Sequence, residues 1–245
     1  MHYLNFLDGI TDFEEAKQIF KEKNLIVKEY NDPDLYILKY DKNSSDLTDS
    51  EIRKCRGLVL SKRDNSVVCL VPIKSVSNDS FNNNFNKNPK QFKIQDFVDG
   101  TMINVFYYNG IQYISTRSCL NAKCKWESDQ TFAELFKECL GNTLKNYERL
   151  DENYCYSFVI QHPENTIVKK YLVPDLLLTL VSKINSDGSV MFYDPYNFVT
   201  ERELDFRTPT EINFNRIEDI YGYVNSLDDS EQGVVIHDIS NNSIQ

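Results

Sequence analysis

The segment Phe97-Val98-Asp99-Gly100-Thr101-Met102-Ile103 separates two stretches in which apolar and polar residues alternate. These stretches are Phe92–Phe97 and Met102–Tyr108, and alternation with a period of two is typical of strands with one buried face. An Asp-Gly pair between such stretches predicts a turn, because glycine adopts positive φ without steric cost. The segment therefore predicts two consecutive β-strands that are joined at Asp99-Gly100.

The same alternation, interrupted by Asn, Asp and Gly, predicts strands on both sides of this segment. They are Leu25–Tyr30, Leu35–Tyr40, Gly57–Ser61, Val67–Pro72, Ile111–Thr116, Tyr154–Gln161, Leu176–Ile184, Val190–Tyr193 and Gly233–Asp238. Helical spacing predicts three helices: Thr11–Lys23 with a Thr11–Glu14 capping box, Ser128–Leu140 ended by Gly141, and Ile217–Leu227. The order of the elements predicts an α+β fold dominated by antiparallel sheet.

Two further predictions concern the organisation of the chain. Residues 1–50 are expected to form a helix and strands that pack on a main unit of residues 51–245, as one continuous globular body. The segment Asn78–Lys90 holds six Asn among thirteen residues together with Pro89, which predicts a loop.

Composition excludes several classes of function. A formal net charge of −10 argues against sequence-independent coating of a phosphate backbone, so any contact with nucleic acid should be local. Six cysteines without Cys-x-x-Cys spacing, and only three histidines, do not predict a metal site. No apolar run approaches the ~20 residues of a membrane span and no secretory leader is present, so a cytoplasmic protein with reduced thiols is expected.

Four segments occur in an order that resembles the adenylation domain of RNA ligases of the T-even phage type. These ligases belong to the covalent nucleotidyltransferases, together with DNA ligases and mRNA capping enzymes. The segments are Lys54-Cys55-Arg56-Gly57-Leu58-Val59-Leu60, Phe97 to Ile103, Tyr156-Ser157-Phe158-Val159 with Pro163-Glu164-Asn165-Thr166-Ile167-Val168, and Glu231-Gln232-Gly233-Val234-Val235. The resemblance covers roughly Arg53 to Asp238 and implies the nucleotidyltransferase fold, related to ATP-grasp.

The resemblance also implies that the reactive residue is missing. In that family a Lys-x-Asp-Gly signature supplies the amine that attacks the α-phosphate of ATP or GTP, and Phe97 stands at the lysine position. A phenyl ring cannot form the phosphoramidate bond. Lys93 is on the same face of the strand but lies roughly 13 Å further back, at the rise per residue of a strand.

Other departures affect the same reaction. The family's ribose-contacting glutamate corresponds to Ser157, and the glutamate of its Glu-Gly-x-Val signature corresponds to Gln232, with Glu231 on the opposite face of the strand. The Lys-x-Lys signature expected further along does not occur before Gln245, so either the natural chain is longer or the element was lost. These changes are typical of an inactive relative.

The remaining residues predict a binding site. Candidates for holding a nucleotide-like group are Arg56, Asp99, Gly100, Arg117, Ser157 and Gln232. Phe97 is a candidate for stacking on a base, worth about 1–3 kcal/mol. A positively charged methylated guanine would add ~0.5–2 kcal/mol of cation–π attraction. Carboxylates that could accept the N–H groups of guanine are Asp96, Asp99 and Glu231.

Each assignment has a plainer alternative. For Phe97 the alternative is a ring that fills the space of a lysine stem, and for each arginine it is an ordinary surface ion pair. His162 and His237 are interpreted as polar strand residues rather than catalytic bases. The basic residues Lys123, Lys125, Lys169 and Lys170 are candidates for contact with an RNA backbone.

Three functions follow from these interpretations. The leading hypothesis is a catalytically inactive RNA-ligase-like domain that binds a nucleotide, an RNA 5′ end or an mRNA cap, with ATP, GTP or cap as ligand and no certain cofactor. The alternatives are an active RNA ligase or nucleotidyltransferase that uses another lysine, and a protein–protein scaffold in an RNA-processing or translation complex. The high Asn, Lys and Ile content with little Gly suggests an AT-rich source such as a large DNA virus, which would place the protein in the host cytoplasm.

Overall fold

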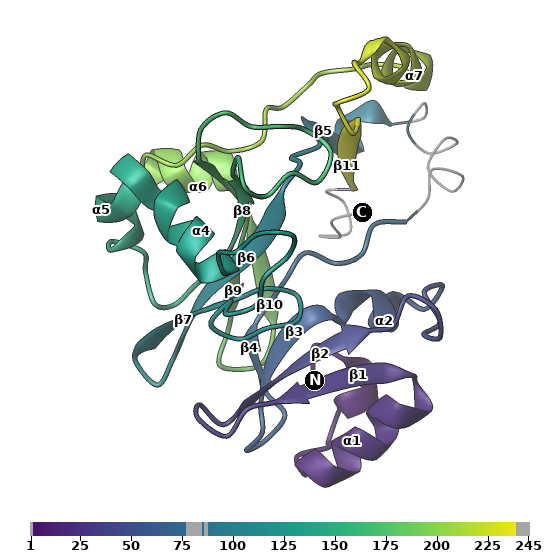
Figure 1. Ribbon diagram of the computed structural model, residues 1–245. Helices are drawn as coiled ribbons and strands as arrows, with labels where there is room; N and C mark the ends of the chain where they lie inside the picture. The colour runs from purple at the N-terminus through teal and green to yellow at the C-terminus, as the bar shows by residue number, and fades with distance from the viewer. Residues whose placement is uncertain (1, 77–84, 86–87, 239–245) are drawn as a thin grey trace.

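The computed structural model describes residues 2–76, 85 and 88–238 and contains three β-sheets with helices around them (Figure 1). Most of the predicted loop at 78–90 therefore lies outside the described residues. The mixture of helices and antiparallel sheets confirms the predicted α+β class.

The N-terminal part is a four-stranded antiparallel sheet of order β1-β2-β3-β4. Its elements are the 3₁₀ turn Asn5–Leu7, α1 (Phe13–Glu22), β1 (Leu25–Glu29), β2 (Leu35–Tyr40), α2 (Ser50–Lys54), β3 (Arg56–Ser61) and β4 (Val67–Cys69). One face of the sheet packs on α1 through Phe20, Tyr36 and Leu38, all of which are fully buried. Because β2 pairs with β3, this sheet joins strands from both sides of residue 50, and the division into 1–50 and 51–245 stays a prediction.

The central sheet has five antiparallel strands in the order β10-β9-β8-β6-β7. Its strands are β6 (Thr101–Tyr108), β7 (Ile111–Ser115), β8 (Cys155–Gln161), β9 (Asp175–Ile184) and β10 (Val190–Tyr193). One face is covered by α4 (Phe132–Leu140), the turn Gly141–Thr143, α5 (Leu144–Tyr147) and α6 (Pro195–Glu201). Every residue of β8 is buried, which identifies β8 as the centre of the fold.

The two larger sheets pack against each other through a shared apolar cluster. Leu35, Ile37 and Val59 of the first sheet contact Phe106 and Cys155 of the second. This contact fixes the position of β3 relative to β6.

A third, two-stranded sheet forms from residues far apart in the chain. Here β5 (Phe92–Asp96), which follows the turn Pro89–Gln91, pairs with β11 (Val234–Asp238) and packs against α7 (Ile217–Ser226). The pairing brings the last strand beside the Phe97-Val98-Asp99-Gly100 segment (Figure 1).

All predicted strands and the three predicted helices are confirmed, with corrected ends. The N-cap of α1 is Asp12, whose carboxylate accepts from Glu15 N at 2.8 Å, so the Thr11–Glu14 capping box was wrong by one residue. The helix predicted from Ser128 begins at Phe132, because Thr131 and Glu134 form the capping box there. The short helices α2, α5 and α6 were not predicted.

Two simple features concern the cysteines and the helices. All six cysteines are free thiols. None of the helices in the described part of the chain has the length and apolar character needed to cross a bilayer.

Gly57 provides a direct test of the contact between the first and second sheets. It has φ +106°, and a Cβ atom there would lie 2.7 Å from the Cα of Arg117. Gly57→Ala is expected to lower the free energy of unfolding by roughly 3 kcal/mol or more, from backbone strain and overpacking. Gly110→Ala, at φ +73° with nothing within 4 Å, should cost only about 1–2 kcal/mol of strain. Equal losses in urea unfolding would contradict the close approach.

His237 on β11 provides a second test, of the third sheet. Burial, and then the charge of Lys93 on the paired strand, lower its pKa from 6.5 to about 4, against the opposing effect of Asp194. The folded state therefore keeps His237 neutral where the unfolded chain binds a proton, so stability falls as the pH drops from 6.5 towards 4. Between about pH 7 and about pH 5 this group is expected to remove roughly 2 kcal/mol of stability. In urea unfolding, the free energy of unfolding of the His237→Gln variant should fall less between these two pH values than that of the unaltered protein. An equal fall in both proteins would contradict the assignment.

Candidate functional site

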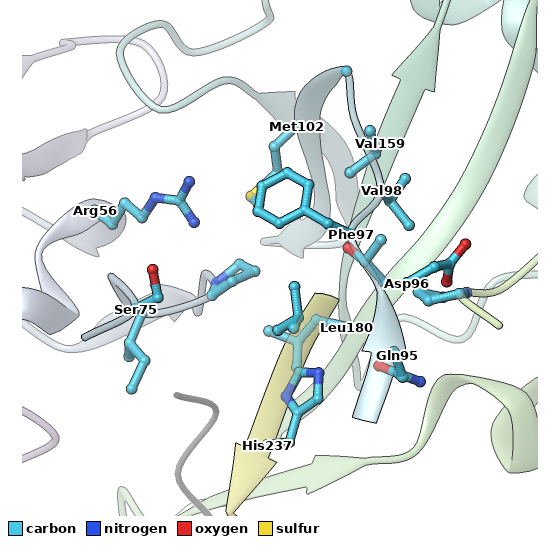
Figure 2. Close-up of a pocket in the computed structure, with 16 residues that line it drawn as sticks. Arg56, Ser75, Gln95, Asp96, Phe97, Val98, Met102, Val159, Leu180 and His237 are labelled. Carbon is cyan, nitrogen blue, oxygen red and sulfur yellow. The ribbon is translucent and has the colours of Figure 1, made fainter. Parts of the chain in front are cut away.

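A cavity of about 280 Å³ opens where β3, β5, β6, β9 and β11 approach one another (Figure 2). Its described walls are mostly apolar, with a few polar groups. They are Arg56, Pro72, Ile73, Ser75, Gln95, Asp96, Phe97, Val98, Gly100, Met102, Val159, Thr179, Leu180, Pro209, Val235 and His237. An apolar cavity with few polar groups suits a small flat ligand such as a base.

Phe97 lies in this cavity and does not fill it. The backbone N–H of Phe97 donates to Gly233 O at 3.0 Å, which holds the residue at the end of the β5–β11 pair. Its side chain is 40% exposed, and Figure 2 shows the ring beside Met102 with the Arg56 side chain extending towards it. The ring is therefore accessible to a ligand.

Arg56 and Arg117 lie near each other at one side of the cavity. Burial, with a further contribution from Arg117, lowers the pKa of Arg56 against the opposing effect of Tyr40. Arg117 does not line the cavity; its Nη2 donates to Tyr40 O at 3.3 Å and its guanidinium lies 4.4 Å from the centre of the Tyr40 ring. Within the described residues neither arginine forms an ion pair with a carboxylate.

Asp99 is a structural anchor rather than an open ligand. It is 4% exposed, and its carboxylate accepts from Val168 N at 3.1 Å, from Lys169 N at 2.9 Å and from the Gln232 side-chain amide. Asp99, which was considered as an acceptor for guanine, and the Gln232 amide therefore already form hydrogen bonds within the protein.

Gly100 and Ser157 have different surroundings. Gly100 lines the cavity at φ +137°, where the backbone passes close to Ile160. Ser157 on β8 is fully buried, its hydroxyl donates to Asn104 Oδ1 at 2.8 Å, and it does not line the cavity.

Two charged residues near the cavity that were considered from the sequence, Lys93 and Glu231, form ion pairs with other residues. Lys93 forms ion pairs with Asp194 and, at 3.3 Å, with Glu211, and it does not line the cavity. Glu231 pairs with Lys169. No lysine occurs among the described residues that line the cavity.

The described side chains that line the cavity offer few ligands for a divalent cation. Asp96 is the one carboxylate among the described lining residues; it accepts from Thr210 N, and Figure 2 shows it directed away from Arg56. Among residues 2–76, 85 and 88–238, no group of three His, Cys, Asp or Glu side chains is placed to hold a metal ion.

Sequence reasoning missed the apolar walls and His237. Met102, Leu180 and Val235 each read as ordinary strand residues, because strand alternation does not say which face meets a cavity. His237 was interpreted as a polar strand residue. Its position at the cavity follows only from the β5–β11 register, which pairs it with Lys93.

No family model matches the chain. A protein of Autographa californica nuclear polyhedrosis virus, named as a bifunctional polynucleotide kinase/RNA ligase, is 24% identical over 92% of the chain, and the match spans 34% of that protein. A 74-residue stretch, 28% of the chain and 16% of its relative, is 39% identical to an immediate-early protein ICP-46 homologue of Invertebrate iridescent virus 3. The chain thus spans about a third or less of the length of these viral relatives.

Solved structures of ligases share the fold. An archaeal ATP-dependent RNA ligase superposes with a TM-score of 0.59 at 10% identity, covering 92% of this chain and 58% of that one. A protein of Aquifex aeolicus named as an ATP-dependent DNA ligase gives 0.57 at 14% identity, covering 94% and 60%. A Naegleria gruberi RNA ligase mutant solved with AMP and Mn gives 0.51 at 11% identity, covering 69% and 53%. The chain therefore has the nucleotidyltransferase fold of ATP-dependent RNA and DNA ligases and resembles the RNA-ligase type in sequence.

Proposed function

We propose that this domain binds a nucleotide, or the 5′-terminal nucleotide of an RNA, without becoming covalently attached to it. The observation that carries the proposal is Phe97, an exposed ring in the cavity at the position of the family's reactive lysine. A ring there can stack on a base, whereas it cannot act as a nucleophile.

The cavity supports a division of roles. Phe97 and Met102 provide apolar surface for the flat face of a base, and the Arg56 side chain, which extends towards the ring in Figure 2, is the cation proposed to meet the attached phosphate. Because Arg56 has no carboxylate partner within the described residues, an arriving phosphate would not have to displace one.

Recognition of the base should depend on stacking more than on carboxylates. Asp99 and Glu231 already have partners, and Asp96 is directed away from Arg56. ATP and GTP are therefore expected to bind with similar affinity. A methylated cap analogue, which carries a positive charge on the base, should bind more tightly by ~0.5–2 kcal/mol.

An active ligase is the second candidate, and the names of the relatives favour it. The viral relative is named for kinase and ligase activity, and the chain spans only 34% of it, so a longer protein would have further residues to contribute. This candidate requires a lysine that becomes nucleotidylated. Lys93, held by Asp194 and Glu211, would first have to leave both carboxylates.

A scaffold for other proteins is the third candidate. The segment between β8 and β9 exposes Ile167, Val168, Leu172 and Val173, with Leu172 93% exposed. Exposed apolar side chains that gather in one segment are typical of an interaction surface.

The test is a calorimetric titration with ATP, GTP, a methylated cap analogue and 5′-phosphorylated RNA. Phe97→Ala is expected to weaken binding by about 1–3 kcal/mol, which is roughly fivefold to more than a hundredfold in Kd, because the stacking surface is lost. The matched control is Tyr196→Ala, which removes an aromatic ring that is 61% exposed and does not line the cavity. Binding that is unaffected by Phe97→Ala would contradict the proposal, and no binding by the unaltered protein would favour the scaffold.

A further inference from the structure

Three basic side chains lie in a row across the first sheet. Lys39 on β2 is paired directly with Arg56 on β3, and on the other side Lys39 faces Ile26, two residues before Lys28 on β1. Residues two apart on a strand share a face, so Lys28 lies on the face of Lys39. Arg56 is opposite Lys39 because the register shifts between Leu38 and Lys39, and its side chain lines the cavity. Ile37, two residues before Lys39, is on the same face as Lys39 and packs against the second sheet. The row therefore lies at the border between the two sheets.

Arg117, two residues after the end of β7, joins the row. Its guanidinium lies over the Tyr40 ring, and the neighbouring Ser118 hydroxyl accepts from Lys39 Nζ at 3.0 Å. The Nε atom of Arg117 is buried and has no hydrogen-bond partner. Lys28, Lys39, Arg56 and Arg117 are called the cation row below.

The cation row lacks neutralising carboxylates within the part of the chain that the structure describes. None of its members forms an ion pair there, whereas Lys17, Lys54 and Lys62 of the same N-terminal region do. Asp41 lies near Lys39, but its carboxylate accepts from Asn43 N and makes no ion pair with Lys39.

The members of the row repel one another. The pKa of Lys39 is lowered by burial and then by the charges of Arg117 and Lys28, with Asp41 opposing. Arg117 likewise lowers the pKa of Arg56, after burial. A chain with a net charge of −10 that gathers four unpaired cations in one place has a local site for a polyanion.

We propose that the cation row binds the phosphates of an RNA strand whose terminal nucleotide occupies the cavity. This inference rests on the proposed function and extends it, because Arg56 belongs both to the cavity wall and to the row. Lys28 is on the second strand from Arg56, so the row extends over two inter-strand spacings, roughly 10 Å, in a direction away from the cavity. Tyr30, whose ring lies 5.7 Å from Lys28 Nζ, places a partly exposed aromatic ring beside the cations, a combination typical of surfaces for single-stranded nucleic acid.

The test compares two ligands across a range of salt concentrations. A 5′-phosphorylated RNA of about ten nucleotides and the mononucleotide are titrated into the full chain and into a Lys28→Gln/Lys39→Gln variant. The variant should bind the RNA about tenfold or more weakly at low salt, with a salt slope smaller by about 1.4 because two phosphate contacts are lost. Its affinity for the mononucleotide should not change.

The matched control is Lys137→Gln/Lys145→Gln, which makes the same change of charge on α4 and α5. Both lysines are exposed, and neither is in an ion pair within the described residues. An equal loss of RNA affinity in the control, or none in the Lys28/Lys39 variant, would overturn the cation row as an RNA site. So would a parallel loss of mononucleotide affinity, which would assign these lysines to the nucleotide itself. RNA binding that depends on Lys28 and Lys39 while no mononucleotide binds would support the row and overturn the role of the cavity.

Discussion

The buried carboxylate of Asp99 is the interaction on which the site depends. A carboxylate removed from water is very costly unless hydrogen bonds replace its hydration, and Asp99 receives them from Val168 N, Lys169 N and the Gln232 amide. These donors belong to the β8–β9 connection and to the segment before β11. One side chain thus joins three parts of the chain that are distant in sequence. Because Phe97 is two residues before Asp99, the same bonds fix where its ring lies.

The fold around the site depends on Asp99 and Gly100, and not on the side chain at position 97. Asp99 and Gly100 are required by the structure, the first for its hydrogen bonds and the second for its close approach to Ile160 at positive φ. The backbone of Phe97 is held by its bond to Gly233 and by the anchoring of Asp99 two residues later, whereas its side chain is 40% exposed and can change without loss of these contacts. The proposed non-covalent binding through the Phe97 ring is therefore compatible with this fold.

The sequence predicted the strands well because alternation is a local property. It was less successful at helix ends, where overlapping patterns such as Thr11–Glu14 and Asp12–Glu15 compete, and it missed the short α6. Of the residues that line the cavity, the sequence motifs singled out Arg56, Phe97 and Gly100 as candidate binding residues. The cation row depends on the register of β1, β2 and β3, including the irregularity between Leu38 and Lys39 that places Lys39 opposite Arg56. No local pattern carries that information.

The most direct test of non-covalent binding is the intact mass of the protein after incubation with ATP or GTP and a divalent metal ion. The geometry at Phe97 predicts an unchanged mass in a sample that retains saturable nucleotide binding. A mass increased by one nucleoside monophosphate, mapped to a lysine, would contradict the account and show that the domain is a working nucleotidyltransferase.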